Sequence, residues 1–137
     1  MKIINKKKRP DVLSGKTHKV KTQCGNFYLT QNFDDGELYE IKMDMGKSGN
    51  CQKGMLSAMS ILYSILLQAK VNKEILTKTI KRHLLGVSCG QEFYTNGEKH
   101  TSCLDWAAKQ ILKELKKEIK IEKKEEKEAN LKEKENE

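Results

Sequence analysis

The chain has 137 residues, a formal net charge of +8, 36% hydrophobic residues and 34% charged residues. This length suits one domain with a small core, and nine glycines and one proline exclude a collagen-like or generally disordered chain. The basic start MKIINKKKR has no apolar h-region after it, and the longest apolar stretch, 55–69, is too short to span a bilayer. We therefore expect a cytoplasmic protein without membrane contact, in a reducing compartment that favours thiols or metal over disulfides.

The positive charge is concentrated near the N-terminus. The first 21 residues hold eight Lys or Arg against the single Asp11, whereas residues 113–137 hold nine Lys and nine Glu. A basic arm attracts phosphates, so it is a candidate contact for nucleic acid. The alternative is a solvated leader, because no aromatic residue interleaves the arm to stack on bases.

Short β patterns alternate with turns between Gly15 and Met45. The stretches KTHKVKT (16–22) and NFYLTQN (26–32) are rich in β-branched and aromatic residues, and ELYEIKMDM (37–45) alternates. The DDG at 34–36 is a hairpin signal, because Asp and Gly tolerate positive φ. These patterns predict three antiparallel strands.

Three helices are expected after the strands. Ser48 can cap a first helix over about 49–70, whose broad apolar face indicates a central helix covered on more than one side. Asn72 can cap a second over about 73–85, which Gly86 ends. Ser102 can cap a third after a polar cysteine loop, with an apolar stripe reaching Ile119.

The resulting fold class is α+β: a small antiparallel sheet of about three strands packed on a central helix, with two further helices and a charged C-terminal helical tail. Beyond about Ile121 almost nothing can be buried, so the tail is expected to fray into disorder. We divide the chain into a basic flexible leader (1–8), a folded domain (9–121) and a disordered charged tail (122–137).

The MGKSG stretch at 45–49 is the one phosphate-loop candidate. It lacks the first glycine of a P-loop, because Ile41 stands at that position. A weaker anion site remains open, formed by Lys47, Ser48 and Gly49 at the start of the predicted helix, whose free N–H groups favour negative charge. The alternative is a simple capped turn.

Four cysteines lie at the predicted ends of elements: Cys24, Cys51, Cys89 and Cys103. None forms a CxxC pair, so their spacing is a weak zinc signal. Glycines lie close to the cysteines. Two of the cysteines lie at helix N-termini, where the helix dipole favours thiolate. A shared metal, reduced core thiols and a redox pair all stay open at this point. The three histidines lack a partner pattern and are expected to be structural or at the surface: His18, His83 and His100.

Several motifs together resemble a known family. LLGVSCG and HTSCLDWAAKQIL are similar to the signature of the TSCPD family. RPDVLSGKTHKVKTQCGNFYLTQN and GKSGNCQKGM resemble the C-terminal domain of adenosylcobalamin-dependent ribonucleotide reductases. The resemblance covers about residues 9–113, and the motifs occur in the family's order.

The resemblance places all four cysteines on family motif positions, which implies one four-cysteine zinc site; iron–sulfur is the rival metal. One departure is Leu104 where the family has proline after its last cysteine, although Asp105 is retained to cap the helix or orient a ligand. The resemblance carries no catalytic residue to this chain. A reductase needs a barrel, a cobalamin site and an active-site thiyl cysteine, which 137 residues cannot hold.

Three functions follow as expectations. The first is a free-standing TSCPD module, zinc-stabilised and accessory to ribonucleotide reduction, DNA synthesis or nucleotide metabolism, with a reductase as partner and no catalysis alone. The second is a binding or sequestering protein for a nucleotide, oligonucleotide or other phosphorylated ligand. The third is an interaction module that forms a homo-oligomer through its sheet or its C-terminal helix.

Overall fold

The computed structural model describes residues 8–46 and 51–136. Its first part is an antiparallel sheet of β1 (Ser14–Thr22), β2 (Gly25–Asp34) and β3 (Glu37–Met45), in the order β1–β2–β3. The predicted strands and the DDG hairpin are confirmed, with positive φ at Asp35 and Gly36. A register shift between Asn32 and Phe33 allows both Leu38 and Tyr39 to be buried.

The second part consists of three helices and a small hairpin. Helix α1 spans Cys51–Gln68, α2 spans Lys73–His83 and α3 spans Cys103–Glu135. The strands β4 (Phe93–Thr95) and β5 (Glu98–His100) pair where the sequence analysis places only a loop. Asn96 and Gly97 form their turn with positive φ, and this Asn-Gly pair is the signal that could have predicted the hairpin.

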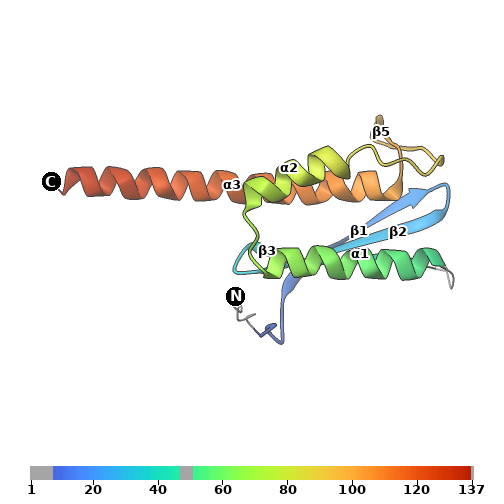
Figure 1. The fold of residues 1–137 in the computed structure, drawn as a ribbon, viewed down its shortest axis with the longest axis horizontal. Helices are drawn as coiled ribbons and strands as arrows, with labels where there is room; N and C mark the ends of the chain where they lie inside the picture. The colour runs from blue at the N-terminus through green and yellow to red at the C-terminus, as the bar shows by residue number, and fades with distance from the viewer. Residues whose placement is uncertain (1–7, 47–50, 137) are drawn as a thin grey trace.

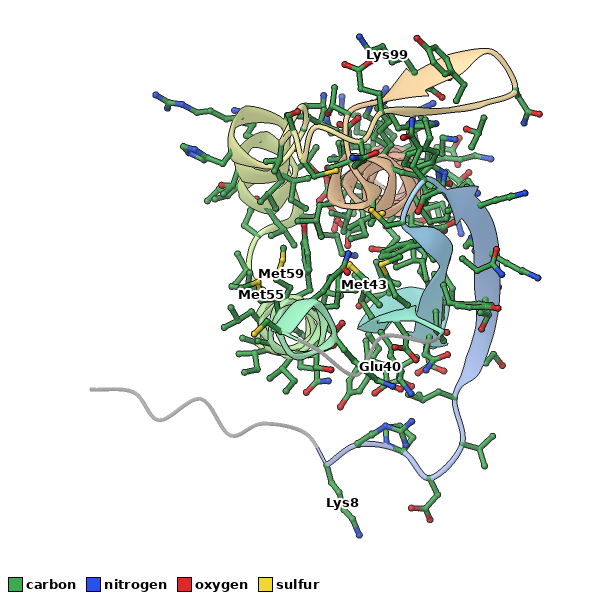
Figure 2. The ribbon with its side chains drawn as sticks, turned by 90° about the vertical axis from the view of Figure 1, so that its right-hand side faces the viewer. Lys8, Glu40, Met43, Met55, Met59 and Lys99 are labelled. Atoms are coloured by element: carbon green, nitrogen blue, oxygen red, sulfur yellow. The ribbon has the colours of Figure 1, made fainter. Side chains whose placement is uncertain are left out.

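Helix α3 lies against one face of the sheet, with α2 beside it, and α1 runs along the β3 side (Figures 1 and 2). The ring of Trp106 meets Phe27 edge-on at 5.9 Å, and Glu118 accepts a hydrogen bond from the amide of Leu38. The core is formed by the inward side of the sheet and the apolar sides of α1, α2 and α3, for example Leu29, Tyr63 and Ile111. The α+β class is confirmed.

The predicted helix caps at Asn72 and Ser102 are present. Asn72 accepts from the amides of Glu74 and Ile75 at 3.0 and 3.1 Å, and Ser102 accepts from the amide of Asp105 at 3.0 Å. The cap proposed at Ser48 lies outside the described residues. Helix α3 continues to Glu135, exposed from residue 120 onward, where the sequence analysis expects fraying. Its Lys and Glu residues are good helix formers, so a charged tail can stay helical without a core. The division of the chain into leader, domain and tail stays a prediction.

Helix α1 differs from its prediction. It packs against β3 and contributes Leu56 and Tyr63 to the core, but five of its large apolar side chains are exposed among the described residues. The breadth of an apolar stripe indicates how much surface favours burial, but not which element buries it.

Candidate functional site: a cysteine-lined cavity

Three of the four cysteines line one cavity of about 510 Å³ at the end of the sheet. Cys24 comes from the β1–β2 turn, Cys89 from the loop after α2, and Cys103 from the first turn of α3. Methionines and other apolar side chains form most of the rest of the wall, including Met45, Met55, Met59, Leu56 and Leu104. Figure 2 shows Met55 and Met59 extending from α1 toward α2. Sequence reasoning did not anticipate these thioethers.

The turn that carries Cys24 is held by its neighbours. The hydroxyl of Thr22 donates to the carbonyl of Gly25 at 2.8 Å and accepts from the amide of Cys24 at 3.1 Å. Gln23 in the same turn donates to the carbonyl of Glu92 at 2.6 Å, which ties the sheet to the loop before β4. The turn is therefore fixed beside the segment that carries Cys89.

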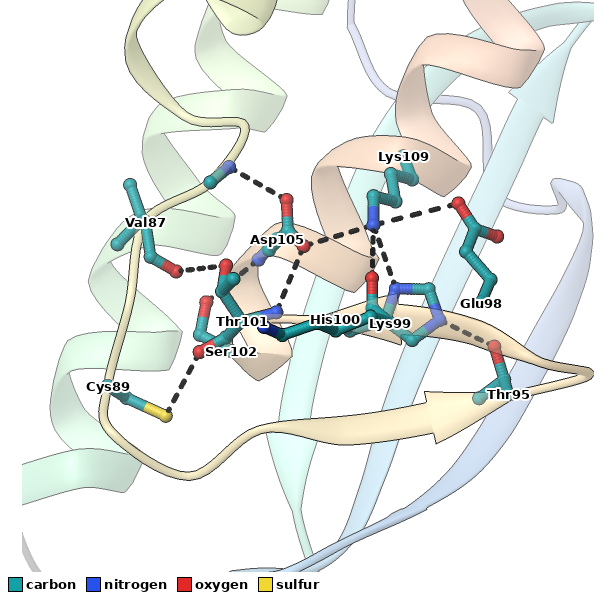
Figure 3. Close-up of polar contacts among 11 residues, drawn as sticks. Val87, Cys89, Thr95, Glu98, Lys99, His100, Thr101, Ser102, Asp105 and Lys109 are labelled. Carbon is teal, nitrogen blue, oxygen red and sulfur yellow. Dashed lines mark hydrogen bonds and ion pairs between the residues drawn. The ribbon is translucent and has the colours of Figure 1, made fainter.

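Asp105 fixes the position of the Cys89 loop against α3 (Figure 3). Its carboxylate accepts from the amide of Gly86 at 2.8 Å and from the amide of Thr101 at 3.2 Å, and it pairs with Lys109 at 3.1 Å. Burial acts to raise the pKa of this carboxyl, but these hydrogen bonds and the Lys109 charge lower it overall. Asp105 therefore holds the two ends of the cysteine loop by their backbone amides, and its suggested role in capping the helix or orienting a ligand stays a prediction.

This arrangement sets the surroundings of Cys89 and Cys103. The amide of Cys89 donates to the carbonyl of Thr101 at 3.2 Å, and its thiol lies 3.8 Å from the same carbonyl oxygen (Figure 3). Burial raises the pKa of the Cys103 thiol; Cys24 and Cys89 add to this effect, and a hydrogen bond with Thr22 opposes it. The electrostatic influence of both thiols on Cys103 agrees with their shared cavity.

Cys51 is the first residue of α1 and is exposed; it does not line the cavity, although the adjacent Gln52 does. Among the described residues no set of three His, Cys, Asp or Glu is arranged to hold a metal ion. Cys24 and Cys89 are also exposed and Cys103 is partly so, an exposure that does not match four packed core thiols. The four-cysteine zinc site stays a prediction.

His100 has the structural role expected for the histidines. It is buried, its Nε2 lies 2.5 Å from the hydroxyl of Thr95, and its Nδ1 lies 3.1 Å from Nζ of Lys109 (Figure 3). An ammonium can only donate, so Nδ1 accepts and the Nε2 proton points to Thr95. Burial, followed by the Lys109 charge, lowers the pKa of His100. Lys109, which sequence reasoning missed, joins the hairpin to α3.

The other predicted contacts remain outside this cavity. Lys47, Ser48 and Gly49 lie outside the described residues, as does most of the basic leader. Arg9, the first residue after the leader, makes two hydrogen bonds of 2.9 Å to the carboxylate of Glu40, which hold the pKa of that carboxyl below its usual range. Arg9 is therefore engaged within the fold, and the nucleic-acid contact of the arm stays a prediction.

Comparison with protein families decides what the chain is related to. A family model described as the TSCPD domain matches residues 3–116, which spans both sheets, α1, α2 and the first part of α3. The chain belongs to the TSCPD family. All four cysteines of this TSCPD domain lie within the matched range, and three of them line the cavity described above. Neither the curated proteins nor the solved structures give a significant match.

No helix in the described parts of this TSCPD protein, 8–46 and 51–136, has the length and apolarity needed to cross a membrane.

Proposed function

We propose that this TSCPD domain is a zinc-stabilised accessory module for ribonucleotide reduction or nucleotide metabolism, without reductase activity of its own. One observation carries the proposal: motif cysteines separated by up to 79 positions, from Cys24 to Cys103, line a single cavity. Thiols brought together from a sheet turn, a loop and a helix start are the donor type that zinc prefers.

The donor set fits zinc in its chemistry. Cys24, Cys89 and Cys103 would hold the ion, and Cys51 is the candidate for the fourth position because it begins α1 beside Gln52, which lines the cavity. Closed sites with four cysteines are structural, and bound zinc would tie the sheet to the helices. Zinc requires each sulfur at about 2.3 Å, so binding would draw the thiols closer together.

The ionisable groups whose pKa values are shifted support a non-catalytic role for this chain. The carboxylates of Asp105 and Glu118 accept backbone hydrogen bonds, and Glu114 pairs with Lys16 at 2.5 Å. His100 is occupied by Thr95 and Lys109. Each of these groups holds one element of the fold against another, as structural groups do.

The zinc part is tested on the full chain, purified without added metal. Elemental analysis and native mass spectrometry should give about one zinc per chain, with no cluster absorbance in the visible range. Cys89→Ser and Cys103→Ser should each remove most of the zinc. Ser88→Ala is the matched control, because Ser88 lines the same cavity without a metal-binding atom of comparable strength. Zinc-free wild type, or a zinc content unaffected by both cysteine variants, contradicts the proposal.

The accessory part needs a second assay. The chain alone, given ribonucleotides, adenosylcobalamin and a dithiol, should form no deoxyribonucleotide. Added to a reductase that lacks a TSCPD domain, the wild-type chain should raise turnover, and the zinc-depleted Cys103→Ser variant should not. Turnover by the chain alone overturns the accessory role. Material absorbing at 260 nm that remains bound through purification would instead favour the binding of a nucleotide-type ligand.

A further inference from the structure

Helix α1 presents more apolar surface than the fold covers. Its buried positions are Leu56 and Tyr63, which join the core, and Ser60, which accepts a hydrogen bond from β3. Of the eleven large hydrophobic side chains that are exposed among the described residues, five lie on this one helix: Met55, Ile61, Leu62, Ile65 and Leu66. Exposed apolar side chains gathered on one helix form a patch of the kind that often marks a binding surface.

The same helix lacks the charges that a solvent-facing helix normally has. No Asp, Glu, Lys or Arg occurs between Lys53 and Lys70. A charge-free face neither repels an identical face nor selects a partner by its charge. Lys53, at one end, is already 4.0 Å from the carboxylate of Asp44, which reduces the repulsion that a second copy would meet there. These features favour a second copy of the chain as the occupant.

The spacing of the stripe is symmetric about its centre. Met55 and Ala58 lie seven and four residues before Leu62, and Leu66 and Ala69 lie four and seven residues after it. At 3.6 residues per turn, the four positions within α1 share one face, and Ala69 directly follows the helix, with its amide still bonded to the carbonyl of Ile65 at 2.8 Å. All five are exposed.

We propose that two copies of the chain pair antiparallel through α1, about a two-fold axis beside Leu62. This register places each Met55 against Ala69 of the second copy and each Ala58 against its Leu66, so that a large side chain meets a small one at every step away from the axis. Matching of this kind lets two helices approach closely.

The size of the surface sets the expected strength. One helix face per copy is smaller than the roughly 800 Å² per partner of a standard interface, so we expect a weak dimer that dissociates on dilution. Leu62 does not line the cysteine cavity. Met55 belongs both to that cavity and to the proposed interface, so association is tested through Leu62, whose substitution leaves the cavity wall and the proposed zinc site unchanged.

The test is sedimentation equilibrium of the full chain, as purified, from about 1 to 300 µM. The wild type should shift from 15.8 kDa toward twice that mass. Leu62→Glu should weaken association at least tenfold. Leu131→Glu is the matched control, because Leu131 is also a leucine in a helix and is 60% exposed, against 62% for Leu62. This control should associate like the wild type.

A charge exchange tests the register itself. Leu62→Lys and Leu62→Glu should each be monomeric, because the axis brings like charges together, and an equimolar mixture should restore dimers. A wild type that stays monomeric at the highest concentration overturns the proposal. So does association that survives Leu62→Glu, or a mixture that fails to pair although circular dichroism shows both variants folded.

Discussion

The backbone amide of Met43 donates a hydrogen bond of 2.8 Å to the hydroxyl of Ser60, which joins the outer edge of the sheet to α1. Ser64, one helical turn later, accepts from the amide of Ile41 at 3.0 Å and donates to its carbonyl at 3.1 Å. β3 is an edge strand, and unpaired edge groups invite pairing with other chains. The two serines satisfy these groups and leave the apolar side of α1 as the surface open to association.

Ser60→Ala should lower the free energy of unfolding by about 1–3 kcal/mol, because the buried amide of Met43 loses its acceptor. The hydroxyl of Ser60 also donates to the carbonyl of Leu56 at 2.7 Å, within its own helix. Urea unfolding followed by circular dichroism measures the change. Ser57→Ala, at an exposed position of the same helix, should stay within about 0.5 kcal/mol of the wild type. Equal effects of the two substitutions would contradict this role of Ser60.

The role of these serines illustrates what the sequence can predict about this fold. Alternation of residues and the DDG turn predict the three strands, and the cap residues Asn72 and Ser102 predict two helix starts. Ser60 and Ser64 lie within the apolar stretch 55–69, where the sequence analysis gives them no role. Their partners are on β3, and no local pattern encodes which strand lies at the edge. The exposure of Leu62 is unpredicted for the same reason, since apolar periodicity does not reveal what covers a helix.

The candidate site, too, could be predicted only in part from the sequence. The motifs single out the cysteines, but only the arrangement of the β1–β2 turn, the loop after α2 and the start of α3 brings Cys24, Cys89 and Cys103 to one cavity. The ties that set this arrangement, such as Asp105 to Gly86 and Gln23 to Glu92, join residues 19 and 69 positions apart. Pairings at such separations follow from tertiary structure. The position of Cys51 relative to the other three cysteines is equally beyond local pattern.

Stability should fall as the pH drops below about 6.5, because of His100. Its pKa is lowered in the folded state by burial and by Lys109, so the folded chain binds fewer protons than the unfolded chain. This contribution is complete above the unfolded pKa of about 6.5 and is lost as the pH falls through the folded pKa. NMR titration of the His100 ring should give a midpoint below 6.5.

A substitution identifies the source of this pH dependence. His100→Phe replaces the ring with an apolar one of similar shape beside Phe93, whose ring centroid lies 5.1 Å away. Denaturant unfolding at pH 7.5 and pH 5.5 should then show a smaller difference in stability than in the wild type. His83→Gln, at the end of α2, should retain the wild-type difference. A pH dependence unchanged in His100→Phe would assign the effect to other groups.

Zinc removal should destabilise the wild type and leave Cys103→Ser unaffected. A structural zinc contributes directly to folding free energy, so a strong chelator should lower the melting temperature of the wild type by roughly 10 °C. Cys103→Ser should melt at the lower temperature with or without the chelator. Thermal unfolding followed by circular dichroism measures both, with Ser88→Ala expected to respond like the wild type. A wild-type melting temperature that does not change with the chelator would indicate reduced thiols without metal.

Removal of residues 125–137 should change the free energy of unfolding by less than about 0.5 kcal/mol, because every described residue in this part of α3 is exposed. This truncation keeps the ion pairs that join α2 to α3, Lys73 with Glu122 at 2.6 Å and Lys123 with Glu74 at 3.5 Å. Truncation after residue 120 removes both, and should cost up to about 1 kcal/mol, since partly exposed pairs contribute little. Urea unfolding measures the stability and circular dichroism the loss of helix. A loss of several kcal/mol in the shorter truncation would mean that the end of α3 packs against the domain.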